Sequence, residues 1–196
     1  MGYAAVILAG GAARRLGGVD KAGLEVGGHV LLRRVLQAVS DAEPRVVVGP
    51  PRSLPDGAMT TQEHPPGAGP VAALAAGLSL VPDHVAYVAV LAGDMPFLTR
   101  DAIGELMAAV TGDAAVFTDG DHPQYLCAVW RLESLRTRLA SLGPPAGTSL
   151  KELYATVAFT QVTSAAQPPP WYDCDTEEDL HRAQELADST SGRLTP

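Results

Sequence analysis

The chain has 196 residues, of which 46% are hydrophobic and 18% are charged, and its formal net charge at pH 7 is −8. This length and composition fit one globular domain and exclude an intrinsically disordered chain. The acidic balance argues against nucleic acid as a partner, because nucleic-acid binding needs a basic face. Any phosphate-binding site must therefore be a local basic patch on an acidic body.

The two cysteines and the apolar runs indicate in which cellular compartment the protein is expected. Cys127 and Cys174 stand far apart, outside any CxxC or Cys/His cluster, so the sequence carries no zinc motif. Two reduced thiols of a cytoplasmic protein are the favoured interpretation, and a disulfide remains the alternative. No apolar run approaches the roughly 20 residues of a membrane span, and no basic stretch precedes the first apolar run. We therefore expect no membrane segment and no signal peptide.

Apolar runs alternate with helical periodicity through the first half of the chain. Continuous apolar runs of this kind are typical of strands buried on both faces of a parallel sheet. The strands that we expect are 3–9, 45–49 and 85–94. The helices that we expect are 29–42, 69–81 and 99–110. Pro70 suits a first helical turn, and Thr99 suits an N-cap.

The same alternation continues in the second half. The strands that we expect are 113–118, 123–130 and 157–162, and the helices are 132–142, 148–155 and 176–188. Thr176 and Asp179 have the spacing of a capping box at the start of the last helix. We expect residues 1–188 to form a single domain and 189–196 a disordered tail. Alternating strands and helices predict a three-layer, Rossmann-like α/β fold with a mostly parallel central sheet.

The stretch LAGGAARRLGGVDK, residues 8–21, follows the first predicted strand. In doubly wound folds, ligands bind at the carboxyl ends of strands. Glycines allow backbone N–H groups to approach phosphate oxygens, and Arg15 and Lys21 add charge that suits β- and γ-phosphates. The stretch is not a Walker A motif, since Ala22 follows Lys21, and it lacks the G-x-G-x-x-G spacing. A solvated surface turn is the alternative, but two glycine pairs behind a buried strand favour a phosphate site.

Carboxylates mark two later segments. LAGDMPFL, residues 91–98, places Asp94 at the carboxyl end of a strand, where it can hold Mg²⁺ with substrate phosphates or form a turn. In WYDCDTEEDL, residues 171–180, Asp173 and Asp175 point the same way in extended chain. The acidic residues after Thr176 complement a helix dipole. Asp173 and Asp175 precede the cap, and a second metal carboxylate is their functional interpretation.

Taken in order, these motifs resemble the molybdenum cofactor guanylyltransferases of the nucleotidyltransferase superfamily. Residues 8–21 are similar to the family signature LAGG-x-x-x-R-M-G-G-x-D-K. GAGPVAAL resembles the segment G-P-L-A-G-L, and GDMPFL resembles a metal-binding aspartate motif. DHPQYLCAVW resembles a D-H-P stretch, and DCDTEEDL resembles N-x-N-T-P or D-x-D-T-P-E-D-L. The matches run from residue 5 to about residue 185.

The resemblance implies Mg²⁺-dependent transfer of GMP from GTP to the terminal phosphate of molybdopterin, with in-line attack and release of pyrophosphate. The residues that it assigns to nucleotide binding are Leu8, Ala9, Gly10, Gly11, Lys21, Glu63 and Asp94. The catalytic residues are Arg15, Lys21 and Asp94, the metal ligands are Asp94 and Asp175, and the acceptor contacts are His122 and Gln124. For His122, a histidine in a polar turn is the alternative. The product is expected to pass to molybdoenzymes or their chaperones.

The sequence departs from the family pattern at two positions that the resemblance places near the nucleotide base. Glu63 stands where the family usually has an Asp associated with guanine, and Gly49 stands where an Asn commonly follows the second strand. A related transferase that uses CTP or another phosphorylated acceptor is therefore the first alternative. The Gly10–Gly11 pair favours the guanylyl branch, since the cytidylyl branch more often has L-A-A-G. The second alternative, a nucleotide-binding protein without catalysis, has less need of both Asp94 and Asp175.

Overall fold

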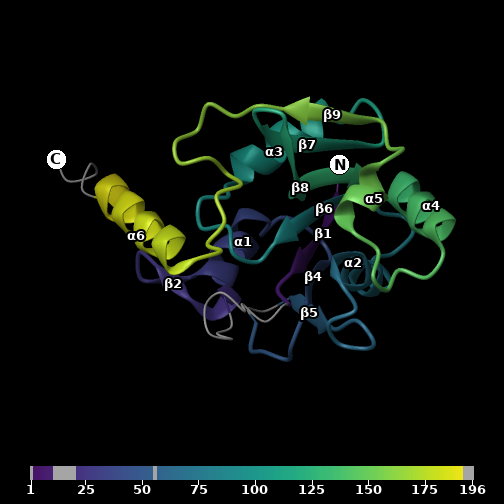
Figure 1. Cartoon of the computed structure of the whole chain (residues 1–196), viewed down its shortest axis with the longest axis horizontal. Coiled ribbons are helices and arrows are strands. Elements are labelled where there is room, and N and C mark those ends of the chain that lie inside the picture. Colours follow the sequence, from purple (N-terminus) through teal and green to yellow (C-terminus); the bar gives the residue numbers. More distant parts are fainter. Residues whose placement is uncertain (1, 11–20, 55–56, 192–196) are drawn as a thin grey trace.

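The computed structural model describes residues 2–10, 21–54 and 57–191, which form one twisted sheet between two layers of helices (Figure 1). In spatial order the seven strands of this sheet are β5 (Ala58–Thr61), β4 (Arg45–Val48), β1 (Tyr3–Leu8), β6 (Tyr87–Ala92), β8 (His122–Arg131), β7 (Ala114–Asp119) and β9 (Phe159–Val162). Strand β8 is antiparallel to both of its neighbours, and the other described pairs are parallel. The predicted three-layer α/β fold with a mostly parallel sheet is confirmed.

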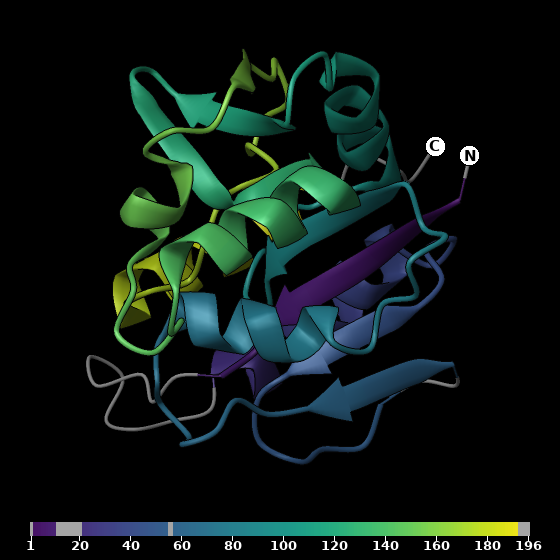
Figure 2. The same ribbon diagram turned by 90° about the vertical axis from the view of Figure 1, so that its right-hand side faces the viewer.

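Helices cover both faces of the sheet. Helices α1 (Leu31–Ala38) and α3 (Arg100–Ala109) share a core with one face. Helices α2 (Pro70–Leu78), α4 (Leu132–Leu142) and α5 (Leu150–Tyr154) share a core with the other, and Figure 2 shows α2 and α4 lying across it. Along β1, Ile7 belongs to the first core and Val6 to the second. This alternation explains why β1 reads as an unbroken apolar run.

The C-terminal helix α6 (Glu177–Ser191) packs away from the sheet. It lies beside a hairpin of β2 (Glu25–Val26) and β3 (His29–Val30), at the other end of the molecule from α4 (Figure 1). Val26, Cys174 and Ala183 are buried together in a third, small core. The Gly27 N–H donates to Oε1 of Gln184 at 2.8 Å. These contacts bring the segment before α6 back to the start of the chain.

The strand order reverses at β1. From β1 the chain moves outward through β4 to β5, and it then returns to β6 on the other side of β1. In open α/β sheets the carboxyl ends of the strands at such a reversal frame the ligand crevice. The residues that follow β1 and β6 are Ala9 and Gly93, and the next residue after Gly93 is Asp94.

Most predicted elements are confirmed, with shorter bounds. Thr99 caps α3 by accepting from the Ala102 N–H at 3.2 Å, and Thr176 and Asp179 form the predicted capping box. The helix predicted from residue 29 begins at Leu31 instead, because residues 29–30 pair with β2 across a glycine turn. The edge strand β5 was not predicted, because its Met59 and threonines do not alternate as a half-buried strand does. The last helix extends to Ser191, and residues 192–196 lie outside the described residues.

Cys127 and Cys174 are both buried and free, as predicted. Burial raises the pKa of each thiol well above its usual range, so both stay protonated at neutral pH. Among the described residues, no helix is both long enough and apolar enough to cross a membrane.

Candidate active site

The carboxyl ends of β1, β4 and β6 meet closely, and glycine is the residue that follows both β4 and β6. The Ala9 N–H donates to the Val48 carbonyl at 2.8 Å, and the Gly93 N–H donates to the Leu8 carbonyl at 2.9 Å. A Cβ on Gly49 would lie 2.7 Å from the Ala9 oxygen, and one on Gly93 would lie 3.0 Å from the Ala9 Cβ. Glycine at both positions therefore allows the backbones to converge, and a Cβ on the next residue, Gly10, would lie 3.4 Å from the Gly49 Cα.

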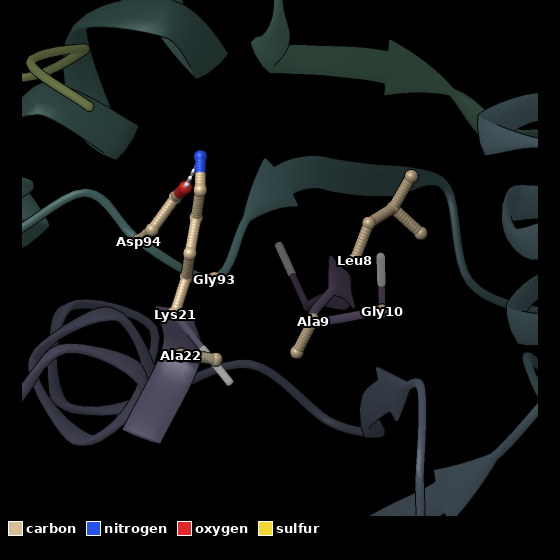
Figure 3. Close-up of a pocket in the computed structure, with 7 residues that line it drawn as sticks. All are labelled: Leu8, Ala9, Gly10, Lys21, Ala22, Gly93 and Asp94. Atoms are coloured by element: carbon tan, nitrogen blue, oxygen red, sulfur yellow. Dashed lines mark ion pairs between the residues drawn. The ribbon is translucent and has the colours of Figure 1, made fainter. Parts of the chain in front are cut away.

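A cleft of about 520 Å³ lies over this junction. Residues from both ends of the chain and from its middle line the cleft: Leu8, Gly10, Lys21, Glu63, Gly67, Gly69, Pro70, Ala73, Ala92, Asp94, Leu126, Asp173 and Asp175. Figure 3 shows a smaller pocket that shares Leu8, Gly10, Lys21 and Asp94 with this cleft, and there Lys21 reaches toward Asp94. A cleft of this volume accommodates a nucleotide-sized ligand.

Among the described residues that line the cleft, Lys21 is the one cation. It lies on a short 3-10 helix, Lys21–Gly23, at the end of the glycine-rich stretch. Its Nζ forms an ion pair with Asp175 and lies 3.9 Å from Oδ2 of Asp94. The Lys21 and Asp94 side chains are only 20% and 17% exposed, so solvent screens their interaction weakly. One ammonium group thus links the segment after β6 to the segment before α6.

The carboxylates outnumber this cation. Burial raises the pKa of Asp94, and the negative charge of Asp175 raises it further, while Lys21 opposes the shift. Burial, followed by the charges of Asp175 and Asp94, raises the pKa of Asp173 to about 6. The charge of Asp175 thus disfavours ionisation of both Asp94 and Asp173, and an added cation would relieve that repulsion.

The protein alone does not complete a metal shell. Among the described residues, no group of three or more His, Cys, Asp or Glu side chains is arranged to hold a metal ion. Asp94 and Asp175 nevertheless face the same cleft and the same Lys21 Nζ. This donor set fits Mg²⁺, which is commonly bound through one or two carboxylates with the remaining ligands from substrate phosphates and water.

Glu63 is a buried acidic residue in the lining of the cleft. Its Oε1 accepts from the Gly67 N–H at 2.8 Å, and the residue is only 9% exposed. Its Oε2 is buried and has no hydrogen-bond partner in the described part of the chain. A buried acceptor without a partner costs free energy, so such an atom in a cleft marks a place where a ligand can donate.

A second cavity of about 210 Å³ opens beside the cleft. The two cavities share Ala92, Leu126 and Asp173 in their linings. Gln124 and the half-buried Trp171 line only the second cavity. The Trp171 ring packs against Phe117, with 5.3 Å between the ring centroids. The aromatic residues Trp171 and Tyr125 and the polar residues Gln124 and Asp173 are therefore all in the lining of the second cavity.

The sequence-predicted residues do not all meet in the cleft. Leu8, Gly10, Lys21, Glu63, Asp94 and Asp175 line it, and Ala9 lines the smaller pocket that shares residues with it. Gln124 lines the second cavity, whereas His122 is exposed at the start of β8 and lines neither. Gly11 and Arg15 lie outside the described residues.

The sequence of this chain matches the model of the MobA-like NTP transferase domain over residues 5–162. The chain belongs to that family. It is 33% identical to a molybdenum cofactor guanylyltransferase of Bradyrhizobium sp. (strain ORS 278), over 93% of this chain and 92% of the relative. It is 27% identical to a protein of the same name from Shewanella sp. (strain MR-4), over 91% of this chain and 93% of the relative.

Solved structures share the fold at lower identity. Molybdopterin-guanine dinucleotide biosynthesis protein A from Archaeoglobus fulgidus superposes with a TM-score of 0.73 at 21% identity, covering 94% of this chain and 98% of that one. The 2-C-methyl-D-erythritol 4-phosphate cytidylyltransferase from Thermus thermophilus gives 0.71 at 23% identity, covering 96% and 100%. The fold of the MobA-like NTP transferase domain thus occurs in proteins named for different nucleotides, and it does not decide the base.

Two residues beside the cleft carry no motif that marks them for a role. Arg52 donates from Nη2 to the Ala9 carbonyl at 2.9 Å, although its position in the sequence gives no sign of this contact. Nothing in the sequence assigns a role to Trp171, which lines the second cavity and packs against Phe117. A pattern search detects spaced side chains, and it misses a side chain whose partner is a distant backbone atom.

Proposed function

We propose that this chain transfers GMP from GTP to the terminal phosphate of molybdopterin and releases pyrophosphate. The observation that carries the proposal is the cleft itself. Glu63, whose buried Oε2 has no hydrogen-bond partner among the described residues, lines one nucleotide-sized cleft together with Lys21 and Asp94. Membership of the MobA-like NTP transferase domain family and the names of the relatives support the same reaction.

In this proposal Glu63 selects the base. The guanine N1–H and N2–H₂ groups form a pair of donors that a carboxylate can accept together. Oε2 of Glu63 is available for one of them, and Oε1 can share its second lone pair with the other. Adenine, cytosine and uracil lack this adjacent pair of donors. Leu8, Ala9 and Gly10 would line the space for the base and ribose.

Charge neutralisation drives the chemistry at the phosphates. Lys21 exchanges its carboxylate partners for phosphate oxygens, and Arg15 is proposed to add a second cation. Asp94 and Asp175 would hold Mg²⁺ with the phosphates. When bound, the ion neutralises charge on the triphosphate and on the leaving pyrophosphate. Preorganised charge and position supply the catalysis in phosphoryl and nucleotidyl transfer, so no covalent protein nucleophile is needed.

The second cavity is proposed for the acceptor. Its aromatic residue Trp171 suits a flat heterocycle, and Gln124 and Asp173 can pair with polar ring edges. An oxygen of the acceptor's terminal phosphate attacks the α-phosphorus of GTP, a new P–O–P bond forms, and the bond to the β-phosphate breaks. His122 is proposed as a weaker contact at the rim. We place the reaction in the cytoplasm, and we propose molybdoenzymes or their chaperones as recipients of the product.

Calorimetric titration with GTP, CTP, ATP and UTP, each with Mg²⁺ and again with EDTA, tests the nucleotide part of the proposal. We expect binding that prefers GTP and that weakens in EDTA. Preference for CTP would instead support the cytidylyl alternative. Two observations motivate this alternative: the similarity to the cytidylyltransferase fold, and Glu63 at a position where the family usually has Asp. Absence of binding to all four nucleotides would contradict the proposal.

A further inference from the structure

The Ala9 carbonyl beside the cleft depends on a side chain. Ala9 is only 7% exposed, so its carbonyl oxygen needs a partner within the protein. Arg52 provides one through Nη2 at 2.9 Å. A guanidinium donor makes a charge-assisted hydrogen bond, which is stronger than a neutral one.

The loop after β4 fixes the orientation of Arg52. The Gly49 N–H donates to the Thr61 carbonyl at 2.9 Å, which ties the start of the loop to β5. Pro50 and Pro51 follow, and their rings fix the backbone φ angles. Nε of Arg52 also lies 3.4 Å from the Pro50 carbonyl. The guanidinium is therefore oriented by a short, stiff connection.

The Ala9–Gly10 peptide has its orientation fixed on two sides. A Cβ on Gly49 would lie 2.9 Å from the Gly10 nitrogen and 2.7 Å from the Ala9 oxygen, so Gly49 packs directly against this peptide. In a trans peptide the N–H points opposite to the C=O. With its carbonyl directed to Arg52, the peptide directs the Gly10 N–H away from Arg52. Gly10 lines the cleft, and in the described part of the chain no backbone carbonyl accepts from its N–H.

We propose that Arg52 is a positioning residue, which holds the Ala9 carbonyl so that the Gly10 N–H donates to an oxygen or ring nitrogen of the bound nucleoside triphosphate. Arg52 does not line the cleft and acts on the ligand through this peptide. Without Arg52, the buried carbonyl would have to find another donor, and the peptide could rotate to do so. The inference rests on the proposed function in one respect, which is that the cleft holds a nucleotide.

Three variants separate orientation from charge. Arg52→Met removes both the donor and the charge, Arg52→Gln keeps a neutral donor, and Arg52→Lys keeps a charged one. We expect Arg52→Met to weaken GTP binding about 10-fold, as loss of one hydrogen bond to the ligand predicts. We expect Arg52→Lys and Arg52→Gln each to recover part of this loss. Arg100→Met is the matched control, because Arg100 hydrogen-bonds Ser40 at 2.7 Å far from the cleft, and we expect it to leave GTP affinity unchanged.

The Gly10 amide gives a readout that general destabilisation would not mimic. In ¹⁵N-labelled protein saturated with GTP and Mg²⁺, we expect the Gly10 amide proton to move downfield in the wild type and to move much less in Arg52→Met. Wild-type affinity in Arg52→Met, or an equal Gly10 shift in both proteins, would overturn the inference and leave the proposed function standing. Failure of the wild type to bind any nucleoside triphosphate would overturn both.

Discussion

Asp94 is the residue at which burial and charge compete most directly. Its carboxyl group lies in the cleft 3.9 Å from the Lys21 ammonium, and burial still raises its pKa. A protein gains nothing in stability from such a carboxylate, because the raised pKa means that the folded state disfavours its ionised form. Its retention in this position is consistent with a role in function.

Replacing Asp94 separates this role from stability. We expect Asp94→Asn to lower pyrophosphate release by about 1,000-fold, because an amide does not neutralise a metal–phosphate centre as a carboxylate does. The melting temperature should stay the same or rise. Asp101→Asn, at an exposed site in the first turn of α3, is the matched control for loss of a carboxylate. Turnover close to wild type in Asp94→Asn would exclude it as a metal ligand.

Glu63 tests base recognition. Glu63→Gln replaces one acceptor oxygen with a donor, which would face the guanine donors. We expect GTP affinity to fall about 10- to 100-fold, while binding of ATP changes little. Glu63→Asp keeps the carboxylate and should lie between the two. Parallel loss of GTP and ATP affinity, measured by calorimetry, would show that Glu63 shapes the cleft without reading the base.

The raised pKa of Asp173 leads us to predict that the stability of the fold depends on pH. Its pKa rises from an ordinary value of 3.8 to about 6, mainly because of burial. The folded state therefore holds this proton more tightly than the unfolded state does, and the resulting stability is lost as the pH rises from about 4 to 6. In Asp173→Asn we expect the melting temperature at pH 7.5 to exceed that of the wild type by about 2 °C, a modest gain because solvent screens this carboxyl. The difference should vanish near pH 4, and an equal difference at both pH values would contradict this origin.

The sequence predicted the chemistry-bearing residues better than the residues that orient them. Lys21 and Asp94 were singled out because they stand in motifs at strand ends, whereas Glu63 was singled out through the resemblance alone, and all three line the cleft. Arg52 could not be found, because its partner is the Ala9 carbonyl and any arginine of the loop would have looked the same. His122 was predicted by resemblance alone, and it lies outside both cavities.

At the scale of elements, α2 shows how packing sets the cleft. A Cβ on Gly77 would lie 2.5 Å from Val6 and 2.8 Å from Val48, so this glycine allows α2 to approach β1 and β4 closely. The same helix begins at Pro70 in the wall of the cleft. Any displacement of α2 from the sheet therefore also moves the cleft wall.

We expect Gly77→Val to reduce the free energy of unfolding by about 2–3 kcal/mol, through overpacking against two rigid β-branched side chains. Nucleotide affinity should fall as well, because the wall near Pro70 shifts. Gly104→Ala is the control, since nothing lies within 4 Å of the added Cβ in α3, and it should stabilise the protein by about 0.5–1 kcal/mol. Denaturant unfolding of both variants checks the contrast. A Gly77→Val protein as stable as the wild type would show that α2 can move without cost.

Elements with a strong period were predictable, and short ones were not. Helix α4 occupies the expected residues 132–142, because its apolar positions recur at helical spacing. The β2–β3 hairpin has strands of only two residues, too short for any periodicity, and its pairing is visible only in three dimensions. That hairpin contacts α6, and Asp175, two residues before α6, forms an ion pair with Lys21.

At the scale of the whole molecule, the cleft depends on the complete fold. Its lining extends in sequence from Leu8 to Asp175, and one ion-paired lysine connects its two ends. The chain matches its relatives over more than nine-tenths of their length, so the same framework is present in each. In the proposed function, the small set of groups around the base, with Glu63 foremost among them, would distinguish guanylyl from cytidylyl transfer.

The most direct test of the account is product formation by the purified wild-type chain. Molybdopterin, Mg²⁺ and either α-labelled GTP or α-labelled CTP would be supplied at equal concentration, and the labelled dinucleotide and pyrophosphate would be measured. We predict the guanine dinucleotide with one pyrophosphate per product, at a rate at least about 100-fold above that with CTP, as expected when a buried acceptor selects for paired donors. Faster transfer from CTP, or GTP binding without any dinucleotide, would contradict the account.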